Sequence, residues 1–495
     1  MRFPKVAEGR HRLRALTLSA ALVLAGIGGA KLVWNWTNAK PALSFITGTI
    51  PSDHIVLPSG QARSVVVLFS GMTGWKDTDQ VLADELIARS AAVVGIALPE
   101  YLSNLANKSE DCHYLISDIE SLSHQIQRAT GGADYRAPIL AGSDMGGGLA
   151  LDLVDQTPSA TIGATVVSDP AVAVPLDRPL CTDAKHTEND NGEIYTLPSS
   201  ALVDPVTVVL SPSASVASRA RAEAFGAAAS GASVSEGAGS EGGLFAAALF
   251  EEVDKISAAP EALPVQVLGT IPTHGTMAII LSGDGGWRDL DRTIGGIFQT
   301  SGVPTVGLDS LRYFWGKRTP EQVAQDITSI VSRYSGPWNA PDVLLMGYSF
   351  GADVLPAAYL ALDPAMQARV KQISLLGLSP AADWEITVSG WLDGPSPAAT
   401  PTGPSLARIP AGLMQCVYGV AETDSPCPGL GKSGVETLQT EGGHHFDGNY
   451  RAIAQDILTS LDQRRARENE PRFGLGPART HSVGCRLYPP RRKCI

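Results

Sequence analysis

The chain has 495 residues, of which 44% are hydrophobic and 18% are charged, and its formal net charge is −12. This composition is typical of folded globular proteins and excludes a disordered chain or a membrane protein with many spans. The length predicts two domains with additional segments. The acidic balance argues against nucleic acid as a partner and mildly favours a cationic or zwitterionic ligand.

The first 40 residues are expected to be a signal peptide or an N-terminal anchor. Basic residues at the start are followed by an apolar run over about residues 15–30. Such a run is short for a spanning helix, which needs about 20 apolar residues, and it suits the core of a signal peptide. Small residues at 28–30 offer a cleavage site, but no clean A-x-A is present. We therefore expect a periplasmic protein, either soluble or anchored to the inner membrane by its N-terminus.

An internal repeat predicts the architecture. The segment SVVVLFSGMTGWKDTDQ, which begins at Ser64, parallels TMAIILSGDGGWRDLDR, which begins at Thr276, and ILAGSDMGGGLAL parallels LLMGYSFGADVLP further on. Apolar strands that alternate with helices predict a parallel sheet with helices on both faces. We therefore predict two tandem α/β domains at 41–260 and 261–463, followed by a basic, disordered tail at 464–495.

Six cysteines fit an oxidising compartment. Their spacing leaves the connectivity open, and free thiols remain an alternative. The candidate pairs are Cys112 with Cys181, Cys416 with Cys427, and Cys485 with Cys494.

The pentapeptide GYSFG, residues 347–351, is a G-x-S-x-G motif between an expected strand and an expected helix. In this setting the motif forms a tight turn that presents the serine at a helix N-terminus, where the helix dipole favours developing negative charge. We therefore predict that Ser349 is a nucleophile and that both repeats are α/β-hydrolase-like domains.

A nucleophilic serine needs a base and an orienting acid, and in this fold the acid precedes the histidine. The segment VYGVAETDSPC reads as a late core strand that ends in an acidic loop. We prefer Asp424 as the acid, with Glu422 as the alternative because of its Gly-x-x-acid spacing. The segment GGHHFDG supplies the base, for which we prefer His445 over His444.

An oxyanion hole is expected to combine two backbone N–H groups. One belongs to Phe350, directly after the nucleophile. The other comes from the loop SGDGGW after the first core strand, where Asp284 or Gly285 is the expected donor.

The first copy lacks this set of residues. Asp144 stands at the position of Ser349, and Gly239 and Ser240 stand where the second copy has its two histidines. The segment TVVLSPSASVASRARA, which corresponds to the acidic loop, contains no carboxylate. We therefore expect a degenerate, non-catalytic first domain that serves packing or binding.

Both repeats, the SGDGGW loop, GYSFGADVLP and GGHHFDG together resemble the bacterial VirJ/AcvB virulence-protein family. The likeness is dense in the second domain and looser in the first, and two such domains after an export signal resemble the longer, AcvB-type members. The resemblance implies a periplasmic serine hydrolase of lipid metabolism. Its reaction would cleave the aminoacyl ester of lysyl-phosphatidylglycerol to lysine and phosphatidylglycerol through an acyl-enzyme on Ser349, at an anionic-lipid membrane surface and without cofactor or metal.

A cationic lysyl group needs carboxylates, and Asp284, Asp353 and Asp383 lie near the expected active-site loops. Each of them is equally an ordinary surface or helix-capping residue. Trp287 and the aromatic residues at 313–315 are expected to form either an apolar lip toward lipid or part of the core.

Two alternative functions stay open. One is an esterase or peptidase of the same fold that acts on a soluble substrate. The other is a non-enzymatic periplasmic adaptor or chaperone for a virulence secretion system, in which the hydrolase folds serve as binding surfaces for secretion-system proteins.

Overall fold

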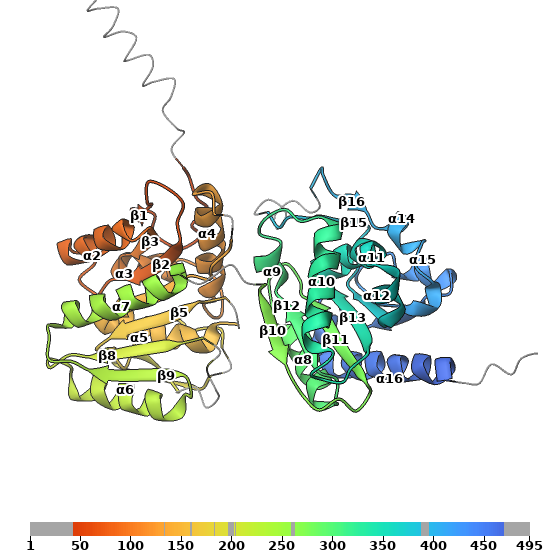
Figure 1. Cartoon of the computed structure of the whole chain (residues 1–495). Helices are drawn as coiled ribbons and strands as arrows, with labels where there is room; N and C mark the ends of the chain where they lie inside the picture. Colours follow the sequence, from red (N-terminus) through yellow and green to blue (C-terminus); the bar gives the residue numbers. More distant parts are fainter. Residues whose placement is uncertain are drawn as a thin grey trace, which may run out of the picture. The chain divides into compact units, whose positions relative to one another are not determined.

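The computed structural model describes residues 43–469, except 133, 159–160, 183, 197–201, 203, 259–262 and 388–395 (Figure 1). The expected signal peptide or anchor at 1–40 and most of the expected tail lie outside these residues. Among the helices that are described, none is long and apolar enough to cross a bilayer.

The first repeat forms a seven-stranded sheet that is parallel except at one edge, where β1 runs antiparallel to β3. Its strands are short and apolar, and the central ones are buried along their whole length, as expected for a sheet covered on both faces. In spatial order they are β1 (His54–Val56), β3 (Ala91–Ile96), β2 (Ser64–Phe69), β4 (Ile139–Ser143), β5 (Ala164–Ser168), β8 (Val206–Leu210) and β9 (Ala232–Glu236).

The second repeat forms a second seven-stranded sheet with the same strand order and the same antiparallel edge. Both sheets thus have the α/β-hydrolase arrangement, so the prediction of two tandem α/β-hydrolase-like domains is confirmed. The predicted boundary after residue 260 falls between the last helix of the first repeat and the first strand of the second. In spatial order the strands are β10 (Val265–Leu268), β12 (Thr305–Leu308), β11 (Thr276–Leu281), β13 (Asp342–Tyr348), β14 (Val370–Leu376), β17 (Met414–Gly419) and β18 (Glu436–Thr440).

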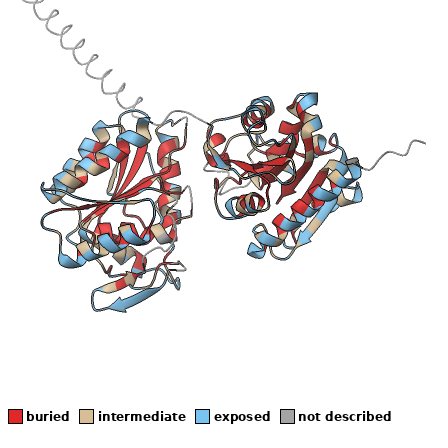
Figure 2. Cartoon of the chain, turned by 60° about the horizontal axis from the view of Figure 1, so that its bottom comes forward, coloured by how far each residue is buried: buried red, intermediate tan, exposed pale blue. Residues whose placement is uncertain are grey.

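Amphipathic helices cover the sheets, which are buried while the outer sides of the helices are exposed (Figure 2). In the first domain α2 (Asp77–Ala88) and α7 (Glu241–Ala258) pack together on one face, and α4 (Ile116–Ala129) and α5 (Asp144–Asp152) contact the central strands β2 and β4. In the second domain α8 (Asp289–Thr300) and α16 (Tyr450–Asn469) cover one face, while α10 (Pro320–Tyr334) and α11 (Phe350–Ala361) cover the other.

Shorter elements complete the two domains. Two small hairpins pair β6 (His186–Asn189) with β7 (Gly192–Tyr195) and β15 (Ala381–Ala382) with β16 (Thr400–Pro401). The remaining helices are α3 (Leu98–Ala106), α6 (Val216–Ala228), α9 (Ser310–Tyr313), α12 (Pro364–Arg369), α14 (Gly403–Leu406) and α15 (Cys427–Lys432), with 3₁₀ turns η1 (Leu153–Gln156), η2 (Ala411–Leu413) and η3 (Phe446–Gly448).

The prediction that the disordered tail begins at 464 is wrong, because α16 continues to Asn469. Arg464 is buried on the inner side of this helix, in line with its apolar residues. Its guanidinium donates to Gly412 O at 2.9 Å and to Met414 O at 2.8 Å, and it pairs with Glu436 at 2.6 Å. A basic residue that satisfies buried acceptors in this way belongs to the domain and not to a solvated tail.

Two of the candidate cysteine pairs are disulfides in the structure. Cys112 is bonded to Cys181 in the first domain, and Cys416 is bonded to Cys427 in the second. The third candidate pair, Cys485 with Cys494, lies outside the described residues.

Candidate active site

The turn between β13 and α11 presents Ser349 at the carboxyl edge of the second sheet. Ser349 has φ 52° and ψ −120°, a conformation that is strained for a residue with a side chain. Its neighbours must be glycine because a Cβ on Gly347 would lie 2.4 Å from Gly351 O, and one on Gly351 would lie 2.2 Å from Leu281 O. The G-x-S-x-G pattern is therefore a steric requirement of the turn.

A hydrogen-bonded chain connects Ser349 to a histidine and a carboxylate. The Oγ atom of Ser349 lies 2.8 Å from Nε2 of His444, and Nδ1 of His444 lies 2.7 Å from Oε1 of Glu422. A carboxylate can only accept, so Nδ1 carries the hydrogen and Nε2 accepts the hydroxyl proton of Ser349. This is the arrangement of nucleophile, base and orienting acid that serine hydrolases use.

Two of the preferred site residues do not belong to this chain of contacts, and their alternatives take their places. Asp424 is exposed on the loop after β17, whereas Glu422 turns inward and accepts the N–H of Gly419 at 2.7 Å. His445 contacts the hydroxyl of Tyr348 at 3.2 Å and not Ser349. The predictions of Asp424 as the acid and His445 as the base are therefore wrong.

The direction of the two histidines is set by the backbone around them. Phe446 and Asp447 both have positive φ, at 53° and 51°, so the chain turns sharply directly after the pair. Gly377, at the end of β14, leaves the space into which the ring of His444 fits, because a Cβ there would lie 2.7 Å from Cε1 of the ring. Gly377 was not predicted from the sequence, where its local signal is a glycine directly after an apolar strand.

The pKa values of His444 and Glu422 are both shifted from the ordinary values of these groups. The hydrogen bond to Glu422 raises the pKa of His444, burial opposes this, and the negative charges of Glu422, Asp284 and Asp353 raise it further. Burial would raise the pKa of Glu422, but its hydrogen bonds from His444 and Gly419 outweigh this and lower it. The pair is therefore held as a carboxylate beside a basic imidazole.

Two of the three carboxylates predicted to bind an ammonium group influence this site. Asp353, one turn after Ser349 on α11, accepts the N–H of Ser379 at 2.7 Å, and burial raises its pKa to about 8. Asp284 is half-buried in the loop after β11 and acts electrostatically on both His444 and Asp353. Asp383 instead binds the backbone N–H of Ser396 at 2.9 Å, and the structure does not bring it to the triad.

The loop predicted to complete the oxyanion hole lies beside the nucleophile. A Cβ on Gly283 would lie 3.6 Å from Cβ of Ser349, and Gly283 N–H is held by the buried carboxylate of Asp291 at 3.4 Å. Phe350 opens α11, so its N–H has no acceptor within the helix. These positions keep Phe350, Asp284 and Gly285 as the candidate donors to an oxyanion.

Trp287, a candidate substrate-binding residue, does not form a lip toward lipid but belongs to the core, which was the other expected role. Its side chain is 5% exposed and packs in the core cluster between α8 and the sheet. Two glycines make room for it, since a Cβ on Gly307 would lie 2.1 Å from its ring and one on Gly295 would lie 3.1 Å from it. The aromatic residues at 313–315 are likewise buried.

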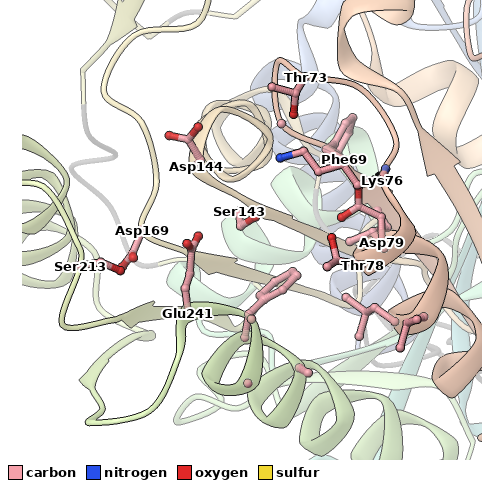
Figure 3. A pocket seen from close by; sticks show the side chains of 18 of the residues that line it. Phe69, Thr73, Lys76, Thr78, Asp79, Ser143, Asp144, Asp169, Ser213 and Glu241 are labelled. Atoms are coloured by element: carbon pink, nitrogen blue, oxygen red, sulfur yellow. Dashed lines mark hydrogen bonds between the residues drawn. The ribbon is translucent and has the colours of Figure 1, made fainter.

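The first domain keeps the same turn without the same chemistry. Asp144 has φ 49° at the position of Ser349, and a Cβ on Gly142 or Gly146 would again strike the backbone, at 2.5 Å in each case. Figure 3 shows Asp144 at the edge of a cavity with Asp169 and Glu241 on the same side. This domain therefore offers a shaped site that has a carboxylate in place of the nucleophilic hydroxyl.

Within the described residues, no group of three or more histidine, cysteine, aspartate or glutamate side chains is arranged to hold a metal ion.

The fold and the triad geometry of the second domain define a serine hydrolase of the α/β-hydrolase class. Residues 275–465 match the family described as "Bacterial virulence protein (VirJ)". No curated protein sequence matches the chain.

Solved structures with similar coordinates include esterases, a peptidase and a thioesterase. Est1E from Butyrivibrio proteoclasticus is 13% identical, with 41% of this chain and 93% of that chain covered and a TM-score of 0.29. Proline iminopeptidase from Mycobacterium smegmatis is 11% identical over 40% and 95% of the two chains, with a TM-score of 0.30. The type II thioesterase YbtT of the yersiniabactin pathway is 14% identical over 41% and 99%, also with a TM-score of 0.30.

Proposed function

We propose that the second domain hydrolyses the aminoacyl ester of lysyl-phosphatidylglycerol, releasing lysine and phosphatidylglycerol. The observation that carries the hydrolytic part is the chain of contacts from Ser349 through His444 to Glu422, at 2.8 and 2.7 Å. The VirJ match and the acidic surroundings of the triad support the choice of an aminoacyl lipid.

The geometry suits two successive acyl transfers. Ser349 Oγ bonds to the ester carbonyl carbon while its proton passes to Nε2 of His444. The bond to the glycerol oxygen then breaks, and that oxygen takes the proton from His444, which leaves lysine esterified to Ser349. A water molecule gives its proton to His444 and attacks this ester, and the proton returns to Ser349 as lysine departs.

The cationic acyl group is the reason for assigning the carboxylates a role in binding. A lysyl ester carries two ammonium groups near neutral pH. Asp284 lies near His444 and acts on it electrostatically, and Asp353 adds negative charge there once it loses its proton. Ion pairing with an ammonium favours the ionised form of a carboxyl group whose pKa burial has raised. We therefore infer that Asp353 releases a proton when a lysyl group binds.

The location is also a proposal. Two disulfides are typical of a protein that folds in an oxidising compartment. Together with the basic leader and apolar run of the N-terminal segment, they support a periplasmic protein, soluble or anchored, that works at an anionic-lipid membrane surface.

The test compares membrane lipids of cells that carry the wild-type chain, Ser349→Ala, His444→Ala or His445→Ala. We expect lysyl-phosphatidylglycerol to accumulate in cells that carry Ser349→Ala or His444→Ala. We do not expect it to accumulate with His445→Ala, because the imidazole of His445 contacts Tyr348 and not Ser349. Equal lipid profiles in all four strains would overturn the lipid substrate. Ser349-dependent cleavage of p-nitrophenyl esters would then favour a soluble substrate, and its absence would favour the adaptor or chaperone function.

A further inference from the structure

The first domain contains a cavity of about 1060 Å³ at the position where the second domain has its active site (Figure 3). The floor is formed by the end of β4, and the walls come from the loop after β2, the start of α2 and the start of α7. In parallel α/β sheets, ligands bind at this carboxyl edge of the strands. The cavity is therefore placed and sized for a small molecule or a headgroup.

The cavity retains a backbone frame that corresponds to that of the triad. The pairing of β4 with β5 and of β13 with β14 makes Asp169 the equivalent of Gly377. Both residues have positive φ, at 43° and 61°, and both donate their N–H to the next strand, at 3.1 and 3.0 Å. Asp169 thus carries a side chain at the position that glycine leaves open for the ring of His444.

A carboxylate still stands near the place of the triad acid. The N–H of Ser211 donates to Oδ1 of Asp169 at 2.8 Å, and Ser211 is the strand-end equivalent of Gly419, whose N–H binds Glu422 at 2.7 Å. The segment after β8 has no carboxylate, so the strand before it supplies one. The degenerate domain has thus kept an oriented acid while losing its nucleophile and its base.

The walls of the cavity carry charged groups of both signs. Asp144, Asp169 and Glu241 lie on one side of the cavity, and Lys76 enters from the side of α2 (Figure 3). Burial raises the pKa of Glu241, the negative charges of Asp169 and Asp144 raise it further, and Lys76 lowers it. A cation between these carboxylates would relieve their mutual repulsion, and an anionic group would be paired by Lys76.

We propose that this cavity binds a ligand that has both an ammonium group and an anionic group. Free amino acids such as lysine and the headgroups of aminoacylated phospholipids share this chemistry. The ammonium group lies against Asp144 and Glu241, and the carboxylate or phosphate lies against Lys76. The choice of lysine among amino acids rests on the proposed function, whereas the site itself rests on the cavity and its retained frame.

Binding and not catalysis is the role that this geometry supports. Asp144 occupies the strained turn of a nucleophile, but in the described part of the first domain no imidazole corresponds to His444. A carboxylate in that turn is exposed to the cavity and can pair with an ammonium group without any proton transfer. If the ligand is the lipid headgroup, the first domain recruits substrate for the second. If the ligand is free lysine, the first domain senses the product of the second.

The test uses the full chain with Ser349→Ala, so that no probe is consumed. Calorimetric titration with L-lysine, and flotation with phosphatidylglycerol vesicles that contain or lack lysyl-phosphatidylglycerol, separate the free amino acid from the lipid headgroup. Adding Asp144→Asn or Glu241→Gln is expected to weaken binding about tenfold or more, since each removes a charge-assisted hydrogen bond. Asparagine tolerates the left-handed conformation of residue 144, so this variant should fold.

Two further variants make the test specific. Lys76→Gln is expected to weaken binding of L-lysine but not of lysinamide, which has no carboxylate. Glu223→Gln, on the exposed side of α6, removes one negative charge away from the cavity and is expected to change nothing. The proposal is overturned if neither lysine nor lysyl-lipid vesicles bind, or if Asp144→Asn and Glu241→Gln bind as tightly as Glu223→Gln.

Turnover is measured separately on chains with an intact Ser349. Hydrolysis of lysyl-phosphatidylglycerol without any Asp144-dependent binding would leave the proposed function standing and remove the inference about the first domain. Asp144-dependent binding without hydrolysis would remove the proposed function and leave the inference about the first domain standing.

Discussion

The ring of His444 occupies the space that a side chain on residue 377 would need, and Gly377 leaves this space free. A Cβ on Gly377 would lie 2.7 Å from Cε1 and 3.0 Å from Nδ1 of His444, and Gly377 has φ 61°. The imidazole is thus positioned by a residue of β14's end as well as by Glu422. The backbone at Gly377, directly after β14, therefore decides whether His444 can reach Ser349.

The first prediction is that Gly377→Ala displaces the base. The methyl group would push the ring away from Ser349, and the left-handed backbone would cost about 1–2 kcal/mol. We expect a loss of ester hydrolysis of about 100-fold or more, as when a triad loses its alignment, with a lower unfolding temperature. The matched control is Gly296→Ala in α8, where a Cβ meets nothing within 4 Å and alanine should slightly stabilise the helix. Equal activity of the two variants would contradict the role of Gly377.

The second prediction concerns the pH profile of Glu422→Gln. Only the neutral imidazole accepts the proton of Ser349, so kcat/KM rises with pH as His444 loses its proton. The hydrogen bond to Glu422 raises the pKa of His444, and so its removal should shift the rising limb to lower pH. The plateau should fall by about 100-fold or more, because the imidazolium formed in the reaction loses its carboxylate.

Asp424→Asn is the control for that experiment. Asp424 is exposed on the same loop, two residues further on, and the change removes the same charge from the surface. Its pH profile is expected to match that of the wild-type chain. A shift of similar size in both variants would mean that general electrostatics, and not the hydrogen bond of Glu422, sets the pKa.

The sequence predicts the two sheets and the nucleophile, but it does not predict which of the neighbouring side chains point toward that nucleophile. The repeat predicts both sheets, and the motif predicts Ser349, because a tight turn imposes its glycines locally. The choice between His444 and His445 is not local: the two are adjacent, and the positive φ of Phe446 and the space above Gly377 decide which ring points inward. Trp287 shows the same limit, because only the fold places Gly307 beneath its ring.

The third prediction is a pH-dependent gain in stability for Asp353→Asn. Burial raises the pKa of this carboxyl to about 8 in the folded protein, above the value of about 4 in an unfolded chain. The folded state therefore binds the proton more tightly, and this contribution to stability is full below about pH 4 and is lost as pH rises to about 8. Asparagine does not titrate and can still accept the N–H of Ser379.

The measurement is thermal unfolding of both chains between pH 4 and pH 9. The unfolding temperature of Asp353→Asn relative to the wild-type chain should increase with pH across this window and level off above about pH 8. Discrimination between lysyl esters and neutral acyl esters should decrease in the same variant. A constant difference in unfolding temperature at all pH values would show that Asp353 is ionised in the free enzyme.

The fourth prediction concerns the disulfide that closes the loop of the acid. Cys416 lies in β17 and Cys427 begins α15, 11 residues apart, and Glu422 lies between them. The bond restricts the loop that holds the carboxylate near His444, and in the loop-entropy account such a short closure stabilises a protein by about 3 kcal/mol. Replacing both cysteines by alanine should lower the unfolding temperature and reduce kcat more than it changes KM.

The corresponding double replacement of Cys112 and Cys181, in the first domain, should lower stability without lowering kcat on a soluble ester. Equal kcat losses in the two double variants would mean that the disulfide near Glu422 acts on global stability alone and does not position the acid.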